Sequence, residues 1–248
     1  MLIKLRNKLT KYNSHKVINL LKNSGWIFFD KIFRIATGLF VSVWIARYLG
    51  PDKFGILNYV ATFPMFFTAL AGLGLTNVLY NDFIIQKDTH QLKKLFCSSV
   101  IIKLISGVFC LTIAVISSVI IDRDNLIILL IGISSIYLIT QSFDVVDTYF
   151  QSQRKVQYSI LPKLIVFGLC CILRVIALWS GKDIMYFVLI NCIEQIFSAL
   201  ISLFVYAQYV QLKLPDVHIY FPIVNDLVKR SWPLMVSEFF YRFMYELI

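Results

Sequence analysis

Long apolar segments constrain this chain more than any other feature. An α-helix needs about 20 apolar residues to cross a bilayer core of about 30 Å. Segments of at least that length occupy residues 24–48, 54–80, 97–121, 126–150, 156–180 and 184–211, and an apolar stretch at 228–248 follows. Only 15% of the residues are charged, so polar side chains cannot cover these segments and lipid must be their solvent. The sequence therefore predicts a membrane protein.

The expected fold is an all-α polytopic membrane helical bundle. We expect a basic N-terminal segment at 1–23, a six-helix lobe at 24–211 and a linker at 212–227. Residues 228–248 would then form a truncated seventh transmembrane helix that starts a second lobe. The first apolar segment is too long for a signal peptide and lacks a small-residue cleavage site, so we expect it to remain as a membrane helix.

The distribution of basic residues predicts the orientation. Lys and Arg are concentrated before the first helix and in 86–95, 151–155 and 212–230, which would all lie on one side of the membrane. The opposite side holds only Arg47, Lys53, Arg123 and Lys182. Basic residues favour the cytoplasmic side, so we expect a cytoplasmic N-terminus. This distribution also explains the formal net charge of +10 without nucleic acid as a partner.

Ionisable residues inside the apolar segments are the strongest functional signal. Each costs about 2.5–3.5 kcal/mol or more at the bilayer centre, so such residues usually face a bundle interior or a watery cavity. The basic members are Lys31, Arg34, Lys103, Lys163, Arg174 and Arg242. We expect four of them to line a cationic, substrate-binding cavity: Lys31, Arg34, Lys103 and Arg174.

The acidic residues in these segments allow two interpretations, namely charge pairing or ion coupling. Asp30 lies one helical turn before Arg34, so the two can neutralise each other. Asp144 and Asp147 form a polar stripe that could pair with cations across the bundle, carry protons or simply mark a wet helix end. Glu194 could couple transport to a proton or cation, and a salt bridge to Arg174 would explain it equally well.

The sequence predicts no catalytic machinery and no cofactor. Ser/His/Asp arrangements, nucleotide-binding loops and metal-ligand spacings are absent from it, so we expect neither an enzyme nor a metal site. The five cysteines lie in apolar runs and are expected to be buried hydrophobic side chains: Cys97, Cys110, Cys170, Cys171 and Cys192.

Three stretches resemble the bacterial polysaccharide flippases, the O-antigen and capsule repeat-unit transporters of the multidrug/oligosaccharidyl-lipid/polysaccharide superfamily. The most specific is Ala46-Arg47-Tyr48-Leu49-Gly50-Pro51-Asp52-Lys53-Phe54-Gly55, and Asp144–Lys155 and Lys229–Leu234 are similar to the family as well. The resemblance implies twelve or more helices in two six-helix lobes around a cationic cavity that opens alternately to each side. It also implies undecaprenyl-diphosphate-linked oligosaccharides as substrates.

These observations favour a flippase of lipopolysaccharide or capsule biosynthesis in the bacterial inner membrane. Its partners would be the lipid-linked oligosaccharide, membrane lipids, a polysaccharide polymerase and other glycan-assembly proteins. A cation-coupled multidrug exporter and a non-transporting membrane scaffold are the alternatives. Because the expected family length is about twice that of this chain, we expect residues 1–248 alone not to transport, with a homodimer of half-transporters as the second possibility.

The charge asymmetry makes a topology prediction. Alkaline phosphatase fused after Asn125 should be active, because that loop is expected in the periplasm, whereas a fusion after Arg154 should be inactive. The opposite pattern of activity would reverse the orientation.

Overall fold

The computed structural model describes residues 2–86, 88–210 and 220–246, and all regular structure in these ranges is helical. The side chains of residues 2–22, 221, 239, 241–243 and 245–246 lie outside this description. The elements are α1 (Leu2–Thr62), η1 (Phe63–Phe67), α2 (Thr68–Gly72), α3 (Leu75–Ile85), α4 (Thr89–Ile121), α5 (Asn125–Thr140), η2 (Gln141–Phe143), α6 (Asp144–Ser152), α7 (Gln157–Trp179), α8 (Ile184–Val210) and α9 (Phe221–Glu246). The all-helical prediction is confirmed.

Five helical stretches of the described residues are long and apolar enough to cross a membrane. They are Asn23–Gly72, Thr89–Ile121, Asn125–Ser152, Gln157–Trp179 and Ile184–Val210. The first of them contains the predicted first segment and most of the second. The expected seventh transmembrane helix is not among them, because α9 carries Asp226, Lys229, Arg230 and Glu238 along its length. The chain is thus a multi-pass membrane protein, and its first stretch holds two of the predicted apolar segments.

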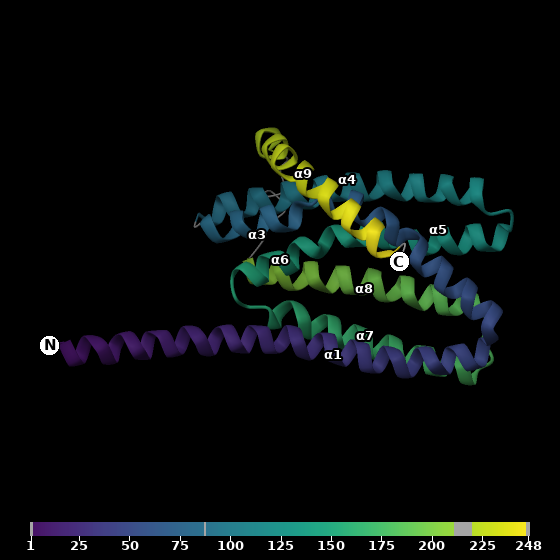
Figure 1. The fold of residues 1–248 in the computed structure, drawn as a ribbon, viewed down its shortest axis with the longest axis horizontal. Coiled ribbons are helices and arrows are strands. Elements are labelled where there is room, and N and C mark those ends of the chain that lie inside the picture. The colour runs from purple at the N-terminus through teal and green to yellow at the C-terminus, as the bar shows by residue number, and fades with distance from the viewer. Residues whose placement is uncertain (1, 87, 211–219, 247–248) are drawn as a thin grey trace.

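A kink at Gly50 reverses the direction of α1. Gly50 has φ 75° and ψ 172°, a conformation that residues with a Cβ rarely adopt, and Pro51 begins the next helical stretch. In Figure 1, α1 runs from the N-terminus along one edge of the bundle and then turns back beside α5 and α8. The predicted turn at Leu49-Gly50-Pro51 is therefore confirmed.

Two of the predicted continuous helices are interrupted. The segment expected at 54–80 is broken by the 3₁₀ turn η1, which contains Pro64, and then by Leu73 and Gly74 with φ values of 53° and 61°. The segment expected at 126–150 is broken by η2 between α5 and α6. Proline at the start of η1 cannot donate a backbone hydrogen bond, which explains the first break.

Two helices begin earlier than the apolar pattern indicated. Helix α4 begins at Thr89 rather than Cys97, because Asp88 caps it by accepting a hydrogen bond from the backbone N–H of His90 at 3.0 Å. Its first turns bury Leu92 and Leu95 despite their polar neighbours. Helix α9 begins at Phe221 rather than near Val228. Short apolar stripes on otherwise polar turns account for both differences.

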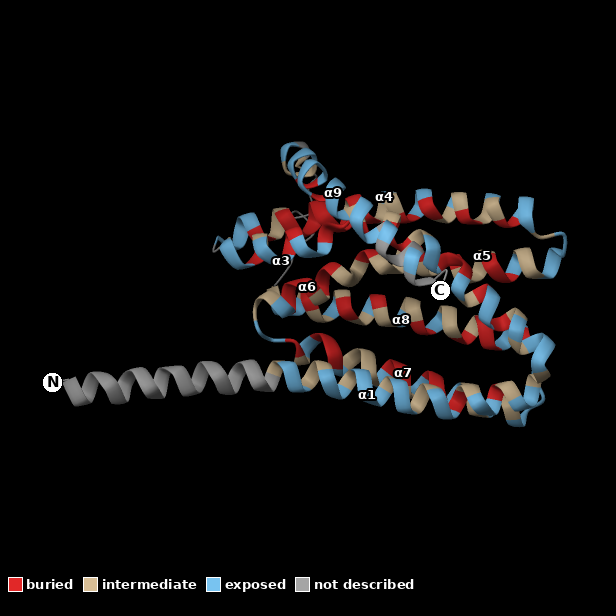
Figure 2. Cartoon of the chain, in the orientation of Figure 1, coloured by how far each residue is buried: buried red, intermediate tan, exposed pale blue. Residues whose placement is uncertain are grey.

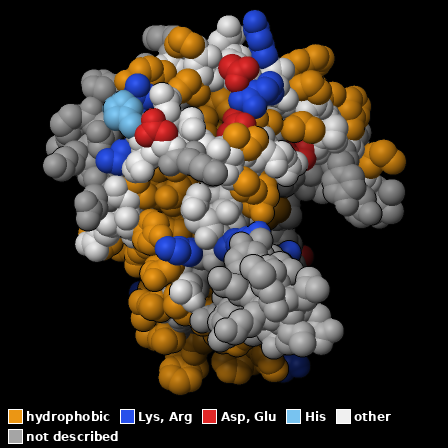
Figure 3. All heavy atoms as spheres, turned by 90° about the vertical axis from the view of Figure 1, so that its left-hand side faces the viewer, with side chains coloured by type: hydrophobic (Ala, Val, Ile, Leu, Met, Phe, Trp, Pro, Cys, Tyr) orange, Lys and Arg blue, Asp and Glu red, His pale blue; other side chains and the backbone are white. Residues whose placement is uncertain are grey.

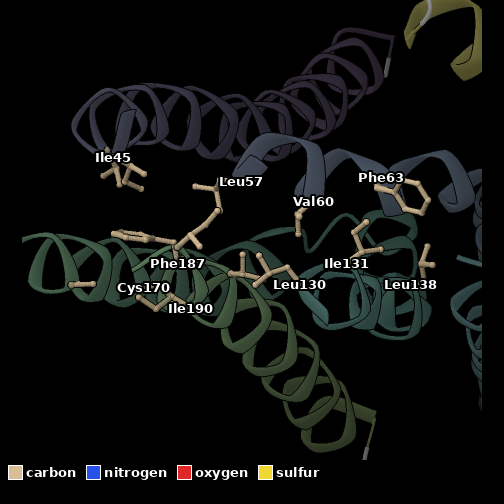
Figure 4. Packing of buried hydrophobic residues seen from close by; sticks show 14 of the residues in the cluster. Ile45, Leu57, Val60, Phe63, Leu130, Ile131, Leu138, Cys170, Phe187 and Ile190 are labelled. Carbon is tan, nitrogen blue, oxygen red and sulfur yellow. The ribbon is translucent and has the colours of Figure 1, made fainter. Parts of the chain in front are cut away.

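Two clusters of buried side chains hold the helices together. One joins α1 to α5, α7 and α8; Figure 4 shows Leu57, Val60 and Phe63 pointing toward Leu130 and Ile131. The other lies around α3, the first turns of α4, α6 and α8. Buried residues face between helices and exposed ones face outward, as Figure 2 shows. Four of the five cysteines are buried as the sequence predicted, whereas Cys192 is only partly buried.

The loops between the helices separate to the two ends of the bundle. Lys53 Nζ contacts Asp183 at 2.8 Å, and Tyr59 donates to Asp122 at 3.1 Å, which ties three connections together at one end. The hydrogen bond from Lys53 lowers the pKa of Asp183 and so favours its ionised form. Helices α3 and α6 lie at the other end (Figure 1). The predicted alternation of loops is thus present, while the cytoplasmic assignment remains a prediction.

Helix α9 packs on α2, α3 and α4 through close backbone contact and a salt bridge. A Cβ added at Gly74 would lie 2.5 Å from the backbone nitrogen of Met235. The Arg230 guanidinium donates to both carboxylate oxygens of Asp82, at 3.0 and 2.8 Å. Figure 3, which views this end of the molecule, shows basic and acidic side chains gathered on its upper part.

We predict that Gly74→Ala loosens α9. The positive φ alone should cost about 1–2 kcal/mol for a residue with a Cβ, and the added methyl group would push against α9. Trypsin should therefore cleave after Lys229 or Arg230 faster than in the parent chain. Gly132→Ala is the matched control, because nothing lies within 4 Å of its added Cβ. Equal cleavage rates for the two variants would contradict this account of the contact.

Candidate functional site

A charged cluster joins α6 to α7 within the membrane-spanning region. Lys163 Nζ contacts Asp147 Oδ2 at 2.5 Å and Asp144 Oδ1 at 4.0 Å. The Ser159 hydroxyl, one turn before Lys163, donates to the other oxygen of Asp147. The predicted stripe of Asp144 and Asp147 therefore pairs with a cation across the bundle, which was one of its possible interpretations.

The same cluster borders a cavity of about 190 Å³ between α1, α6 and α7. Asp30 and Lys31 of α1 line it together with Asp147 and Lys163. Arg34 lies one turn farther along α1, where its Nε donates to Asp30 at 2.8 Å and its guanidinium lies 4.9 Å from the centre of the Phe167 ring. Arg34 is thus paired, whereas Lys31 has no ion pair within 4.0 Å among the described residues.

A second charged cluster joins α7 to α8. Arg174 Nη2 donates to Glu194 Oε2 at 2.5 Å and to Asn191 Oδ1 at 2.8 Å. Only 14% and 10% of the Arg174 and Glu194 side chains are exposed. A cavity of about 270 Å³ adjoins this pair, lined by Ala61, Pro64, Met65, Ser134, Tyr137, Arg174, Asn191, Cys192, Glu194 and Gln195. Arg174 and Glu194 thus form the salt bridge that was one of the two interpretations of Glu194.

Lys103 is a buried residue of α4, the helix that packs on η2 at the break between α5 and α6. Helix α4 approaches α5 closely at Gly107, where an added Cβ would lie 2.5 Å from the Leu138 carbonyl oxygen. Lys103 lies one turn before Gly107 on α4. It is only 2% exposed, and no carboxylate of the described residues lies within 4.0 Å of its amine. Two buried polar atoms of η2, Gln141 Oε1 and Ser142 Oγ, have no hydrogen-bond partner in the described chain.

The predicted site residues thus divide into separate groups. Asp30, Lys31, Arg34, Asp144 and Asp147 lie around or next to the α1–α6–α7 cavity, with Arg174 and Glu194 at the α7–α8 cavity and Lys103 at η2. The predicted site did not include Lys163, although the Lys163 amine contacts both Asp144 and Asp147. The spacing of Ser159 and Lys163, one turn apart on α7, was the available signal.

A third cavity contains none of the predicted site residues. It measures about 410 Å³, lies between α3, α4 and α9, and borders the Asp82–Arg230–Asp226 salt bridges. Among the described residues, no group of three or more His, Cys, Asp and Glu side chains is arranged to hold a metal ion.

Comparison with known proteins identifies one family. A family model described as "Polysaccharide biosynthesis protein" matches residues 20–247, which include every helix that carries the charged clusters. No curated protein and no solved structure matches the chain.

The Arg174–Glu194 pair makes a stability prediction. Arg174→Ala should destabilise the protein by about 3–5 kcal/mol, because it leaves a buried carboxylate without a counter-charge. Replacing both residues by methionine should cost much less, since no charge is then buried. Thermal unfolding of the purified variants measures the difference. If the single substitution proves no more harmful than the double one, the two side chains are not energetically coupled.

Proposed function

The chain belongs to the polysaccharide biosynthesis protein family, and we propose that it is a flippase for lipid-linked oligosaccharides. In this proposal it moves undecaprenyl-diphosphate-linked repeat units from the cytoplasmic to the periplasmic leaflet of a bacterial inner membrane, for O-antigen or capsule synthesis. Family membership and the five candidate spans support a membrane transporter. The charged groups inside those spans supply the argument for the substrate.

One observation carries the proposal: two lysines in the spans lack a counter-charge within 4.0 Å among the described residues. Lys31 borders the α1–α6–α7 cavity, and Lys103 is buried at η2. A charge at membrane depth is costly and usually marks a substrate or ion pathway. Asp30 and Asp147 also line the cavity of Lys31, and Asp144, Asp147 and Glu238 act on Lys103 from beyond 4.0 Å. A diphosphate would supply the close counter-charge that both amines lack, so the anionic part of the substrate is assigned to them.

Breaks in the helices fit a transporter that changes shape. Helical segments interrupted near the membrane midplane commonly surround transporter binding sites. Here η1, the left-handed pair Leu73–Gly74 and η2 interrupt the spans. The Gln141 side chain amide donates to the Thr68 carbonyl at 3.4 Å, which links the two interrupted regions beside Lys103. Alternating access is assigned to bending at these breaks.

A multidrug exporter is the second candidate, and one observation favours it. The cluster of Asp144, Asp147 and Lys163 holds one more acid than base, which suits binding of a cation or proton. In a flippase the same cluster would couple transport to a proton or cation. A membrane scaffold with a polysaccharide polymerase as partner requires no such cluster.

Complementation of a flippase-deficient strain by the protein tests the proposal. We expect Lys103→Met and Lys31→Ala to reduce surface glycan about tenfold or more, since each loss of a charged phosphate contact of about 1.5–3 kcal/mol corresponds to at least that factor. Lys4→Ala is the control, because Lys4 is one of several basic residues before the first helix. Protein amounts in the membrane are matched by immunoblot.

Two outcomes would decide against a flippase. Resistance to cationic drugs without restored glycan would favour the exporter. Normal glycan from the Lys31→Ala, Lys103→Met double variant would remove both lysines from the substrate pathway.

A further inference from the structure

We propose that the α7–α8 cavity is a sugar subsite that binds an uncharged saccharide unit rather than the diphosphate. This inference rests on the proposed function, because it assigns a different part of the same lipid-linked substrate to a different cavity. Arg174 alone in a cavity would attract an anion. The geometry around it favours a neutral ligand instead.

The charge of this cavity is balanced. Arg174 and Glu194 are in direct contact at 2.5 Å, and the other side chains that line the cavity are uncharged. An anion entering here would lose its hydration and meet the Glu194 carboxylate as well as the guanidinium. The attraction and the repulsion would largely cancel, so the cavity offers little net stabilisation to a phosphate.

The same pair nevertheless keeps hydrogen-bonding capacity. A guanidinium has five N–H donors, and in the described chain the Nη2 group alone serves Asn191 and Glu194, while Nη1 contacts only Cys171 Sγ at 3.6 Å. Glu194 Oε1 accepts no hydrogen bond from the described residues, since only Oε2 is engaged. A hydroxyl group can accept from the first and donate to the second, which suits a vicinal diol.

The remaining lining matches the mixed surface of a sugar ring. Ser134, Asn191 and Gln195 supply polar groups that donate and accept, whereas Ala61, Pro64 and Met65 supply an apolar wall for C–H faces. The cavity volume of about 270 Å³ lies just below the about 300–1,000 Å³ range of small-molecule sites. It therefore suits one sugar residue rather than a whole repeat unit.

Cys192 provides a reporter in the cavity itself. It lines the cavity and is partly exposed, whereas the other four cysteines are buried. A ligand in the cavity should slow the reaction of its thiol with a maleimide. Labelling is followed by peptide mass spectrometry on the full 248-residue chain in phosphatidylcholine nanodiscs, so no transport activity is required.

The probes are N-acetylglucosamine as the neutral sugar and inorganic pyrophosphate as the anion. We expect N-acetylglucosamine to slow labelling of Cys192 saturably, by about threefold at twice its Kd, and pyrophosphate to have no effect. In Glu194→Gln the guanidinium loses its counter-charge while the side-chain shape is kept. Pyrophosphate should then protect Cys192 as well. Lys182→Ala, outside the cavity, should behave like the parent chain.

Protection of the parent chain by pyrophosphate but not by N-acetylglucosamine would overturn the inference, and so would the absence of protection by either probe. The labelling readout does not require transport, so it can be scored separately from complementation. If the protein fails complementation but N-acetylglucosamine protects Cys192, the flippase proposal fails and the sugar subsite stands. If the protein complements but N-acetylglucosamine does not protect Cys192, the sugar subsite fails and the flippase proposal stands. Unchanged labelling of the four buried cysteines checks that Glu194→Gln keeps the fold.

Discussion

The cost of placing charge inside a membrane organises this protein. An ionisable side chain on a spanning helix needs a partner, and the nearest partner lies on a neighbouring helix or one turn away. Arg34 uses Asp30 on its own helix, whereas Lys163 and Arg174 of α7 reach α6 and α8 respectively. Helix α7 is therefore held by ionic contacts on two sides, and the two cavities that adjoin those contacts flank it.

The interruptions of the helices lie close to the same charges. A break exposes backbone groups that lipid cannot satisfy, so it is tolerated only where protein or water surrounds it. Pro64 and Met65 of η1 line the cavity of Arg174, and η2 lies beside Lys103. Backbone groups left unpaired at the breaks and charged side chains thus lie in the same regions, away from lipid. Each makes the other less costly, which explains why they occur together.

Sequence analysis predicted the spans better than their internal structure. Apolar length is a property of each segment alone, so five spans and the Gly50 turn could be recognised. The breaks could not be predicted, since the sequence of Gln141–Phe143 resembles ordinary helix and the turn depends on packing against α4.

The partners of the charges were partly predictable. Asp30 and Arg34 share one helix, but the pairing of Asp147 with Lys163 rather than Lys103 depends on tertiary register. The start of α9 at Phe221 could not be predicted from apolar runs, because Asp226 and Arg230 interrupt the apolar run there.

The proposed substrate, a lipid-linked oligosaccharide, has two chemically different parts, and the proposal assigns them to two differently charged parts of the chain. Its diphosphate carries fixed negative charge, whereas the sugar attached to it offers hydroxyl groups and C–H faces. A single cationic cavity would hold the diphosphate strongly but could not distinguish the sugar, because a point charge has no directional preference. The balanced pair of Arg174 and Glu194 has the opposite properties, with weak attraction for anions and directed donors and acceptors. Lysines without a counter-charge close by would then supply affinity, and the neutral cavity would supply selection among sugars. With the two roles on separate residues, a substitution in the sugar site would leave the proposed diphosphate contacts unchanged.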